Sequence, residues 1–161
     1  MSLIPCTYHK DYIDSIRSGV DSIYLFDRTC NEPLYTVFDF SRFEELEQLV
    51  ISNDSFLYVQ TFVIDGLNSF KILKIGSNCF TKEKLKHEND PDRSFHIVNC
   101  PLLETIDIGS GSFVDYGGEF ELSNLPSLLT LSIGALEEDS YNFFSCQSFA
   151  LKSDSLISLS V

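Results

Sequence analysis

The sequence has no tryptophan and only 1 methionine among its 161 residues, and it is poor in basic side chains. There are 11 Lys and Arg against 24 Asp and Glu, which gives a formal net charge of −13. Binding to a nucleic-acid backbone or to an anionic membrane surface requires clustered Lys and Arg. The charge balance therefore argues against both kinds of partner.

Long apolar runs are also missing. No run approaches the roughly 20 apolar residues of a membrane-spanning helix, so no membrane insertion is expected. Residues 1–9 lack the basic end and the long apolar core of a signal peptide. As written, the chain is expected to be cytoplasmic or otherwise intracellular. If it is a fragment of a longer chain, an extracellular or cell-surface location is the alternative.

The 5 cysteines show no spacing that indicates a metal site or a disulfide framework. There is no Cys-x-x-Cys motif and no Cys/His pairing at zinc spacing. An odd number of cysteines in a reducing compartment needs no bridge, so free thiols are expected. Cys30 and Cys100 stand where equivalent segments carry Phe or Leu, which predicts that both are small core hydrophobes.

What the sequence does contain is a repeat. Six segments read apolar-x-x-apolar-x-apolar, and they span 20–25, 46–51, 70–75, 103–108, 128–133 and 156–161. Between them recurs an apolar pair two residues apart, led by Phe38, Phe62, Phe95, Phe120 and Phe149. The spacings of these Phe residues are 24, 33, 25 and 29. A self-similar period in this range predicts a solenoid, in which each unit buries its apolar edge against its neighbours.

Residues 70–80 read Phe-Lys-Ile-Leu-Lys-Ile-Gly-Ser-Asn-Cys-Phe. This segment resembles the strand consensus of leucine-rich repeat proteins, Leu-x-x-Leu-x-Leu-x-x-Asn-x-Leu. The resemblance extends from about residue 20 to 161, with divergent repeats of irregular length. It implies a β-rich repeat solenoid of the α/β class, with about six parallel strands on a concave face. The period-two alternation of the intervening segments favours short extended or irregular stretches on the convex side.

The sequence departs from this family at the consensus Asn, which is present as Asn78 but replaced by Asp54 and Gly111. In the family, that Asn side chain bonds the backbone of neighbouring turns. We therefore expect a broken ladder, with stacked Phe side chains holding the turns together. The unit at 136–140 is expected to lose its late aromatic residue and to carry an insertion.

The sequence predicts a cap at the N-terminal end of the solenoid and none at the C-terminal end. Apolar residues at helical spacing before Gly19 predict a short capping helix within residues 10–18. The predicted domains are thus an N-terminal cap at 1–19 and a solenoid of about six units at 20–161, uncapped at its C-terminal end. An open terminal strand invites pairing. The favoured interpretation is a fragment of a longer repeat array, and the alternative is self-association through that strand.

A charged insertion at 82–93 interrupts the repeat. Such a polar insert is typical of a solvated loop, and a specific contact site is the alternative.

One stretch is similar to the glycine loop of methyltransferases that bind S-adenosylmethionine, in which a strand enters Gly-x-Gly-x-Gly. Residues 105–113 supply the strand and two of the glycines, but Phe113 stands in place of the third, and Gly117 and Gly118 would break the helix that must follow. No nucleophile has a His fixed nearby, and no acidic turn has calcium-ligand spacing. We predict no catalytic, cofactor-binding or metal-binding residues.

In a strand, the residues between the apolar positions point away from the core. The resulting surface carries the residues that we predict to bind a partner: Tyr24, Gln48, Val50, Ile72, Lys74, Thr105, Asp107, Thr130 and Ser132. Leucine-rich repeat proteins generally use this face for protein partners. The resemblance therefore implies a non-enzymatic protein–protein interaction scaffold. A structural, surface-coat or adhesion segment of a longer protein is the alternative, and an S-adenosylmethionine-binding enzyme ranks third.

Overall fold

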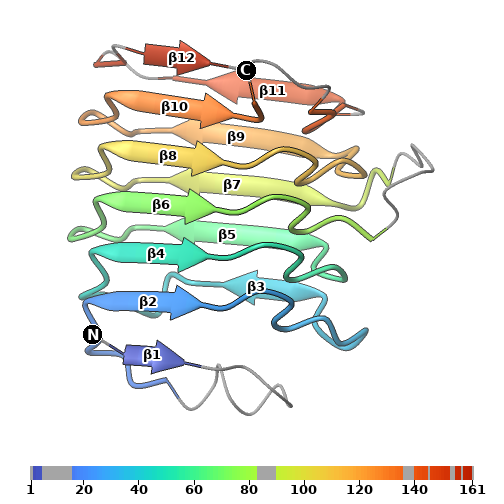
Figure 1. Cartoon of the computed structure of the whole chain (residues 1–161). Coiled ribbons are helices and arrows are strands. Elements are labelled where there is room, and N and C mark those ends of the chain that lie inside the picture. The colour runs from blue at the N-terminus through green and yellow to red at the C-terminus, as the bar shows by residue number, and fades with distance from the viewer. Residues whose placement is uncertain are drawn as a thin grey trace.

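The computed structural model describes residues 2–4, 16–82, 90–135, 140–144, 146–152, 155–156 and 158–160. These residues form two parallel β-sheets that face each other (Figure 1). In spatial order the first sheet consists of β1 (Ser2–Ile4), β2 (Ser22–Leu25), β4 (Gln48–Ile51), β6 (Ile72–Ile75), β8 (Thr105–Ile108), β10 (Thr130–Ile133) and β12 (Ser158–Ser160). The second consists of β11 (Ser148–Leu151), β9 (Glu119–Ser123), β7 (Ser94–Val98), β5 (Thr61–Asp65) and β3 (Val37–Asp39).

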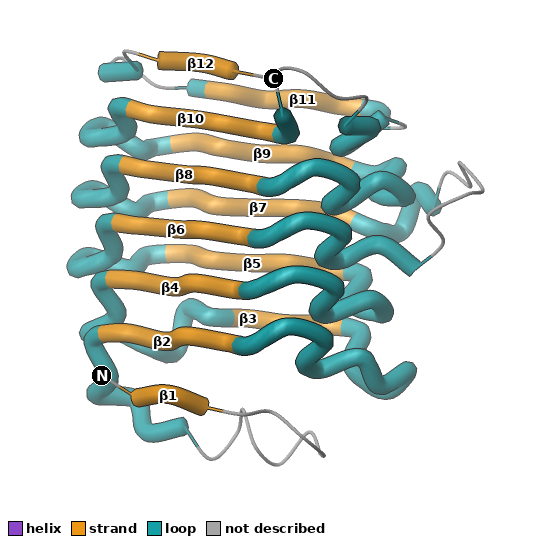
Figure 2. Tube along the Cα trace, viewed as in Figure 1, coloured by secondary structure: helices purple, strands orange, loops and turns teal. Residues whose placement is uncertain are grey.

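The chain alternates between the two sheets and advances by one strand per turn, so it is a β-solenoid of about five turns (Figure 2). The part of the chain that the structure describes contains strands and turns but no helix, and hence no helix that could cross a membrane.

The register of the seven-stranded sheet confirms the predicted alignment of the repeats. Neighbouring strands place equivalent apolar residues opposite one another, in a column of Ile23, Leu49, Leu73, Ile106, Leu131 and Leu159. The five-stranded sheet does the same with the leading Phe residues, in a column of Phe38, Phe62, Phe95, Phe120 and Phe149. Successive turns therefore lie in register on both sides of the core.

Two stacks of phenylalanine rings fill the space between the sheets. One stack consists of Phe62, Phe95, Phe120 and Phe149, with centroids 4.3 to 5.1 Å apart and interplanar angles of 3° to 7°. The other consists of Phe56, Phe80, Phe113 and Phe143, with centroids 4.6 to 5.2 Å apart and angles of 4° to 9°. Rings of the two stacks meet edge to face, as Phe62 does with Phe80 at 84°. Both geometries are favourable for aromatic pairs, and they confirm that Phe stacking joins the turns.

One prediction about the core is wrong. The unit at 136–140 does not lose its late aromatic, because Phe143 takes that place, 4.9 Å from Phe113. The insertion delays this residue: Phe113 follows Ile108 by five positions, whereas Phe143 follows Ile133 by ten.

The ends and the second side of the solenoid also differ from expectation. The sheet has seven strands and not about six, because β1, in the segment predicted as a cap, pairs in parallel with β2. The capping helix predicted within 10–18 lies mostly outside the described residues, and residues 16–19 form a bend and a turn. The side predicted to carry short extended or irregular stretches is extended throughout its strands, which form a regular parallel sheet of five.

This second sheet also removes the reason for a concave surface. A repeat solenoid curves into a horseshoe when its units are wider on one side than on the other. Strands have the same spacing of about 4.8 Å in both sheets, so the two sides have equal width. The predicted concave side is an outer sheet face, and we call its nine predicted residues the outer face.

Backbone conformation explains the departures from the consensus Asn. The equivalent residues Asp54, Asn78 and Gly111 all have left-handed φ values, of 56°, 57° and 71°. Asn, Asp and Gly are the residues that adopt this conformation most readily. Arg28 and Tyr141, at the same place in the first and fifth turns, are also left-handed with φ values of 60° and 51°, so the turn imposes this conformation on whichever residue stands there.

Candidate functional site

The structure places all nine predicted partner-binding residues on one surface. They come from five neighbouring strands, β2, β4, β6, β8 and β10. One row consists of Gln48, Ile72, Thr105 and Thr130, each directly opposite the next. The other row consists of Tyr24, Val50, Lys74, Asp107 and Ser132. Their role in binding stays a prediction.

A rigid layer supports this outer face. Leu49 and Leu73, which alternate with the outer-face residues along β4 and β6, are fully buried. Because buried and outer-face side chains alternate along each strand, substitutions on the outer face are not expected to remove core side-chain contacts. The surface is therefore fixed in shape before any partner arrives.

The N-terminal half of the outer face carries its largest side chains. The Tyr24 hydroxyl donates a 2.8 Å hydrogen bond to Gln48 Oε1 across two strands, which fixes both side chains. Val50 and Ile72 beside them are partly exposed. Tyr is enriched at the energetic centres of protein interfaces, so these four residues form the best candidate for a contact centre.

The C-terminal half is different in chemistry. Lys74 and Asp107 stand opposite each other in the register and are both exposed. Beside Asp107 on β8 is the hydroxyl of Thr105, and β10 adds the hydroxyls of Thr130 and Ser132 and no large apolar group among the predicted residues. The two halves thus differ in the kind of contact that they can make.

Comparison of the chain with models of known protein families, with curated proteins and with solved structures finds no match in any of the three. What holds for the fold is the coarser description, a repeat β-solenoid with parallel sheets. The leucine-rich repeat type is not shown.

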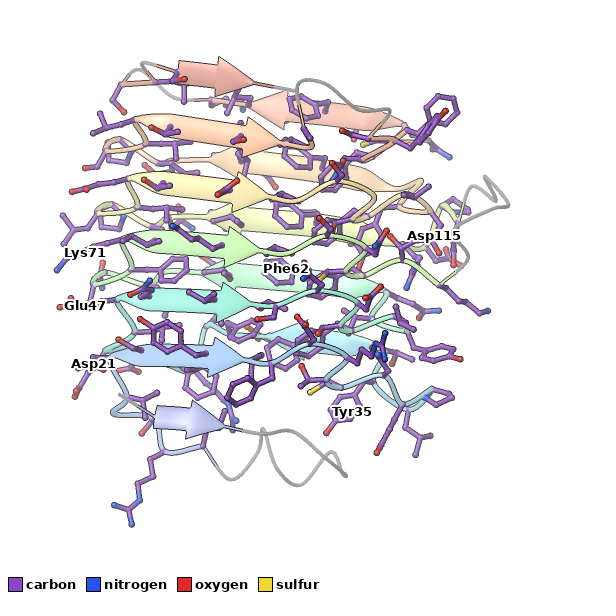
Figure 3. The ribbon with its side chains drawn as sticks, in the orientation of Figure 1. Asp21, Tyr35, Glu47, Phe62, Lys71 and Asp115 are labelled. Atoms are coloured by element: carbon purple, nitrogen blue, oxygen red, sulfur yellow. The ribbon has the colours of Figure 1, made fainter. Side chains whose placement is uncertain are left out.

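One edge of the outer face is charged. The residues that precede β2, β4, β6 and β8 are Asp21, Glu47, Lys71 and Glu104, and the first three lie one above another in Figure 3. Lys71 Nζ contacts Glu47 Oε2 at 3.0 Å, with both side chains about half exposed. An ion pair exposed to this degree contributes at most about 1 kcal/mol. This edge therefore presents net negative charge without depending on that pair for stability.

Sequence reasoning missed a ladder of small polar side chains inside the solenoid. The residue that precedes each stacked aromatic donates a hydrogen bond to a backbone carbonyl of the preceding turn. The bonds join Ser55 Oγ to Phe26 O (3.2 Å), Cys79 Sγ to Ser52 O (3.0 Å), Ser112 Oγ to Gly76 O (2.8 Å) and Asn142 Nδ2 to Gly109 O (2.9 Å). This ladder is separate from the consensus Asn ladder, because its side chains stand one residue after the consensus Asn position. The recurrence of a small polar residue before Phe56, Phe80 and Phe113 was the available signal.

A Ser112→Ala substitution tests this ladder. Ser112 is fully buried, and its hydroxyl donates to Gly76 O and accepts from Cys79 N–H at 2.9 Å. Alanine leaves two buried backbone groups unpaired, so we expect a loss of about 1–3 kcal/mol in the free energy of unfolding, measured by urea denaturation. Ser110→Ala is the control, because the Ser110 hydroxyl makes only a 3.4 Å contact with Ser140 Oγ. Equal effects of the two substitutions would contradict a structural role for the ladder.

A second side-chain ladder runs along the corner that follows the five-stranded sheet. Asn124 Nδ2 donates to Asn99 Oδ1, and Asn99 Nδ2 donates to Asp65 Oδ1, both at 2.8 Å. Asn99 and Asn124 also have left-handed φ values of 56° and 54°. Asn99 directly precedes Cys100, and Asn124 directly precedes the equivalent Leu125, so this recurrence was the available sequence signal for the ladder.

A buried charged cluster lies at the base of the 82–93 insertion, whose residues 83–89 are outside the described part of the chain. The Arg93 guanidinium forms an ion pair with Asp115, and its Nη2 donates to the carbonyls of Leu57 (2.7 Å) and Val59 (2.8 Å). It also lies 4.9 Å from the ring centre of Tyr116. Burial raises the pKa of the Asp115 carboxyl above its usual value, although the guanidinium acts to lower it. The cluster joins three turns of the solenoid.

The repeat gave no signal for this cluster. In the register of the five-stranded sheet, Arg93 corresponds to Gln60 of the preceding turn, which is exposed. A residue at that place is therefore not expected to be buried.

In the glycine loop that resembles a cofactor site, three backbone N–H groups are already hydrogen-bonded to neighbouring turns. The N–H groups of Gly109, Gly111 and Phe113 donate to Ile75 O, Ser140 O and Cys79 O in neighbouring turns. A Cβ atom on Gly109 would lie 2.7 Å from the Gly76 carbonyl carbon, so close packing of the turns accounts for that glycine. These three N–H groups cannot also bind a ligand. Within the described ranges, no three His, Cys, Asp or Glu side chains are grouped as ligands of a metal ion.

The four described cysteines, Cys30, Cys79, Cys100 and Cys146, are free thiols, and the first three are buried. Burial raises the pKa of Cys79 to about 12 and that of Cys100 to about 11. Because the thiolate is the reactive form, we expect Cys146 to react first with a disulfide reagent at neutral pH. A Cys6→Ser background leaves only these four thiols, and thiol release is followed with and without denaturant. Fast reaction of more than one thiol in the folded protein would contradict this assignment.

Proposed function

We propose that this chain is a non-enzymatic scaffold that binds a protein partner through the outer face of the seven-stranded sheet. The observation that carries the proposal is the fixed pair of Tyr24 and Gln48 beside the partly exposed Val50 and Ile72. An aromatic side chain held in place by a hydrogen bond loses little conformational freedom on binding, so more of the contact energy remains as affinity.

Charge suggests the chemistry of the partner. The chain carries a net charge of −13, and the edge of the outer face presents Asp21, Glu47 and Glu104 with one Lys. A partner with an apolar contact centre and basic residues at its rim fits this arrangement. Complementary charge of this kind mainly accelerates association and is screened by salt.

We also assign the repeats to a divergent leucine-rich repeat type. The support is the strand pattern together with the left-handed residues at the consensus Asn position. The regular second sheet, where short extended or irregular stretches were predicted, is the main departure.

A binding comparison tests the proposed function. Tagged wild type and Tyr24→Ala/Ile72→Ala are used to capture partners from an extract of the source cells, and each captured protein is then purified and titrated. We expect at least a tenfold loss of affinity for the variant. Val37→Ala/Val63→Ala is the matched control, since both residues lie on the opposite outer surface. A partner that binds all three forms equally would contradict the proposed face.

The second candidate is a structural, surface-coat or adhesion repeat. The small hydroxyls on the C-terminal half of the outer face favour it, because that half offers no anchor for a partner. Under this alternative, no captured protein distinguishes the Tyr24→Ala/Ile72→Ala variant from wild type.

A further inference from the structure

The charged side chains on the outer face and at its edge change sign between two neighbouring strands, β6 and β8 (Figure 1). Lys74 of β6 stands directly opposite Asp107 of β8, and both side chains are exposed. Lys71 precedes β6 and Glu104 precedes β8, and the Glu104 N–H donates to Lys71 O. The line between these two strands therefore separates two basic residues from two acidic ones.

Side-chain size also changes across this line. At equal distances from it, Val50 of β4 corresponds to Ser132 of β10, and Ile72 of β6 corresponds to Thr105 of β8. Each larger apolar side chain on one side thus has a smaller hydroxyl side chain at the same place on the other. A surface on which both charge and size reverse in this way is complementary to itself after a half-turn about the line.

Such a half-turn, about an axis parallel to the strands, lays the outer face on that of a second copy. β6 then lies over β8 of the second copy, and β4 lies over its β10. Lys74 of each copy faces Asp107 of the other, so two lysines and two aspartates alternate around the axis. Lys71 contacts Glu47 within its own chain, so Lys74 and Asp107 carry the argument. Sheets that pack face to face keep their strand directions within about 30° of each other, as this axis requires.

Contact area and net charge set the expected strength of this contact. The six strands from β2 to β12 lie three on each side of the line. At about 4.8 Å between strands and about 3.3 Å per residue, four residues of each cover roughly 400 Å² per copy. A standard interface uses about 800 Å² per partner. The net charge of −13 also opposes association, although salt near 0.15 M screens charges more than about 8 Å apart. We therefore expect a weak and reversible dimer.

We propose that a second copy of this chain docks on the outer face, in a two-fold dimer whose axis runs between β6 and β8. This inference rests on the proposed use of the outer face for binding and names an occupant for it. Contact between identical surfaces closes after two copies and does not propagate. Any other protein partner must displace the second copy, so self-association limits access to Tyr24 and Ile72.

Two charge-reversal variants and their mixture test the dimer. Lys74→Asp sets two acidic side chains against each other across the interface, and Asp107→Lys sets two basic ones. Because like charges in contact cost several kcal/mol, we expect each variant alone to dimerise at least about tenfold more weakly than wild type. An equimolar mixture restores opposite charges at both contacts and is expected to form a heterodimer. Both variants keep a large net negative charge, so only local pairing brings them together.

Sedimentation analysis up to about 1 mM in about 0.15 M salt measures these masses against the 18.2 kDa monomer. Glu119→Lys is the matched control, because Glu119 is exposed on β9, on the opposite outer surface, and this variant is expected to dimerise like wild type. A wild type that stays monomeric, or a mixture no more associated than its two components, would overturn the dimer. If the wild type is monomeric while a captured protein still loses affinity for Tyr24→Ala/Ile72→Ala, the dimer fails and the proposed function stands.

Discussion

Phe113→Ala is expected to lower the free energy of unfolding by about 3–5 kcal/mol. Phe113 is fully buried, and its ring stacks on Phe80 and Phe143 at 4.6 and 4.9 Å. It also meets Phe95 and Tyr116 edge to face. Removing it leaves a cavity in the middle of its own ring stack and beside Phe95 of the other stack. The loss is a large part of the roughly 5–15 kcal/mol that stabilises a typical domain.

Urea denaturation followed by circular dichroism measures this loss. Phe144→Ala is the matched control, since the same ring is removed from an exposed place in a turn. Exposed substitutions usually change stability by no more than about 0.5 kcal/mol. Deleting a core Phe side chain usually costs about 3–5 kcal/mol. A Phe113→Ala loss below about 1 kcal/mol would therefore show that neighbouring turns do not enclose the ring.

The second large effect is expected at the buried ion pair. Asp115→Ala leaves the Arg93 guanidinium buried without its counter-charge, so we expect a loss of about 3–5 kcal/mol. The double variant Arg93→Met/Asp115→Leu removes both charges and keeps apolar volume. It is expected to lose less than Asp115→Ala alone, although Leu57 O then lacks the hydrogen bond from Arg93.

Thermal and urea unfolding of the two variants and of wild type give the comparison. Glu47→Ala provides the control, because it removes the partner of Lys71 in an exposed pair and is expected to cost less than about 1 kcal/mol. If the double variant were less stable than Asp115→Ala, the cost would come from the lost hydrogen bonds of Arg93 and not from an unpaired charge.

The repeat architecture could be predicted from the sequence because its signal is redundant. Apolar residues at Leu49, Leu73, Ile106 and Leu131 recur in the same phase, and parallel in-register strands are the arrangement that buries them all. The same phase placed the nine outer-face residues on one surface. Their recurrence decides which way each side chain points, but it carries no information about a partner.

The second sheet was not predicted because a pattern of two apolar residues per segment fits both irregular extended chain and a strand. The pair at Phe62 and Ile64 is such a case. β5 is a strand because it is hydrogen-bonded to β3 and β7. The leading Phe residues of these two strands, Phe38 and Phe95, are 24 and 33 residues from Phe62 in the sequence. Parallel pairing is therefore a property of the stack and not of any one segment.

The late aromatic of the fifth turn was missed for a different reason. A fixed offset from Ile133 leads to residue 138, whereas five extra residues move the equivalent ring to Phe143. The burial of Arg93 follows from contacts with Asp115 and Tyr116 of the next turn. Neither position can be found by aligning repeats, because an insertion breaks the offset in the first case and contacts specific to one turn decide the second.

The central claim is that the turns lie in register, and contacts between methyl groups test it most directly. In a sample with labelled Leu and Ile methyls, nuclear Overhauser effects are expected between Leu49 and Leu73, Leu73 and Ile106, and Ile106 and Leu131, whose strands are about 4.8 Å apart. No such effect is expected between Leu49 and Leu131, which are separated by three strand spacings. Effects that join these residues in any other order, or none between neighbours, would contradict the solenoid and the outer face built on it.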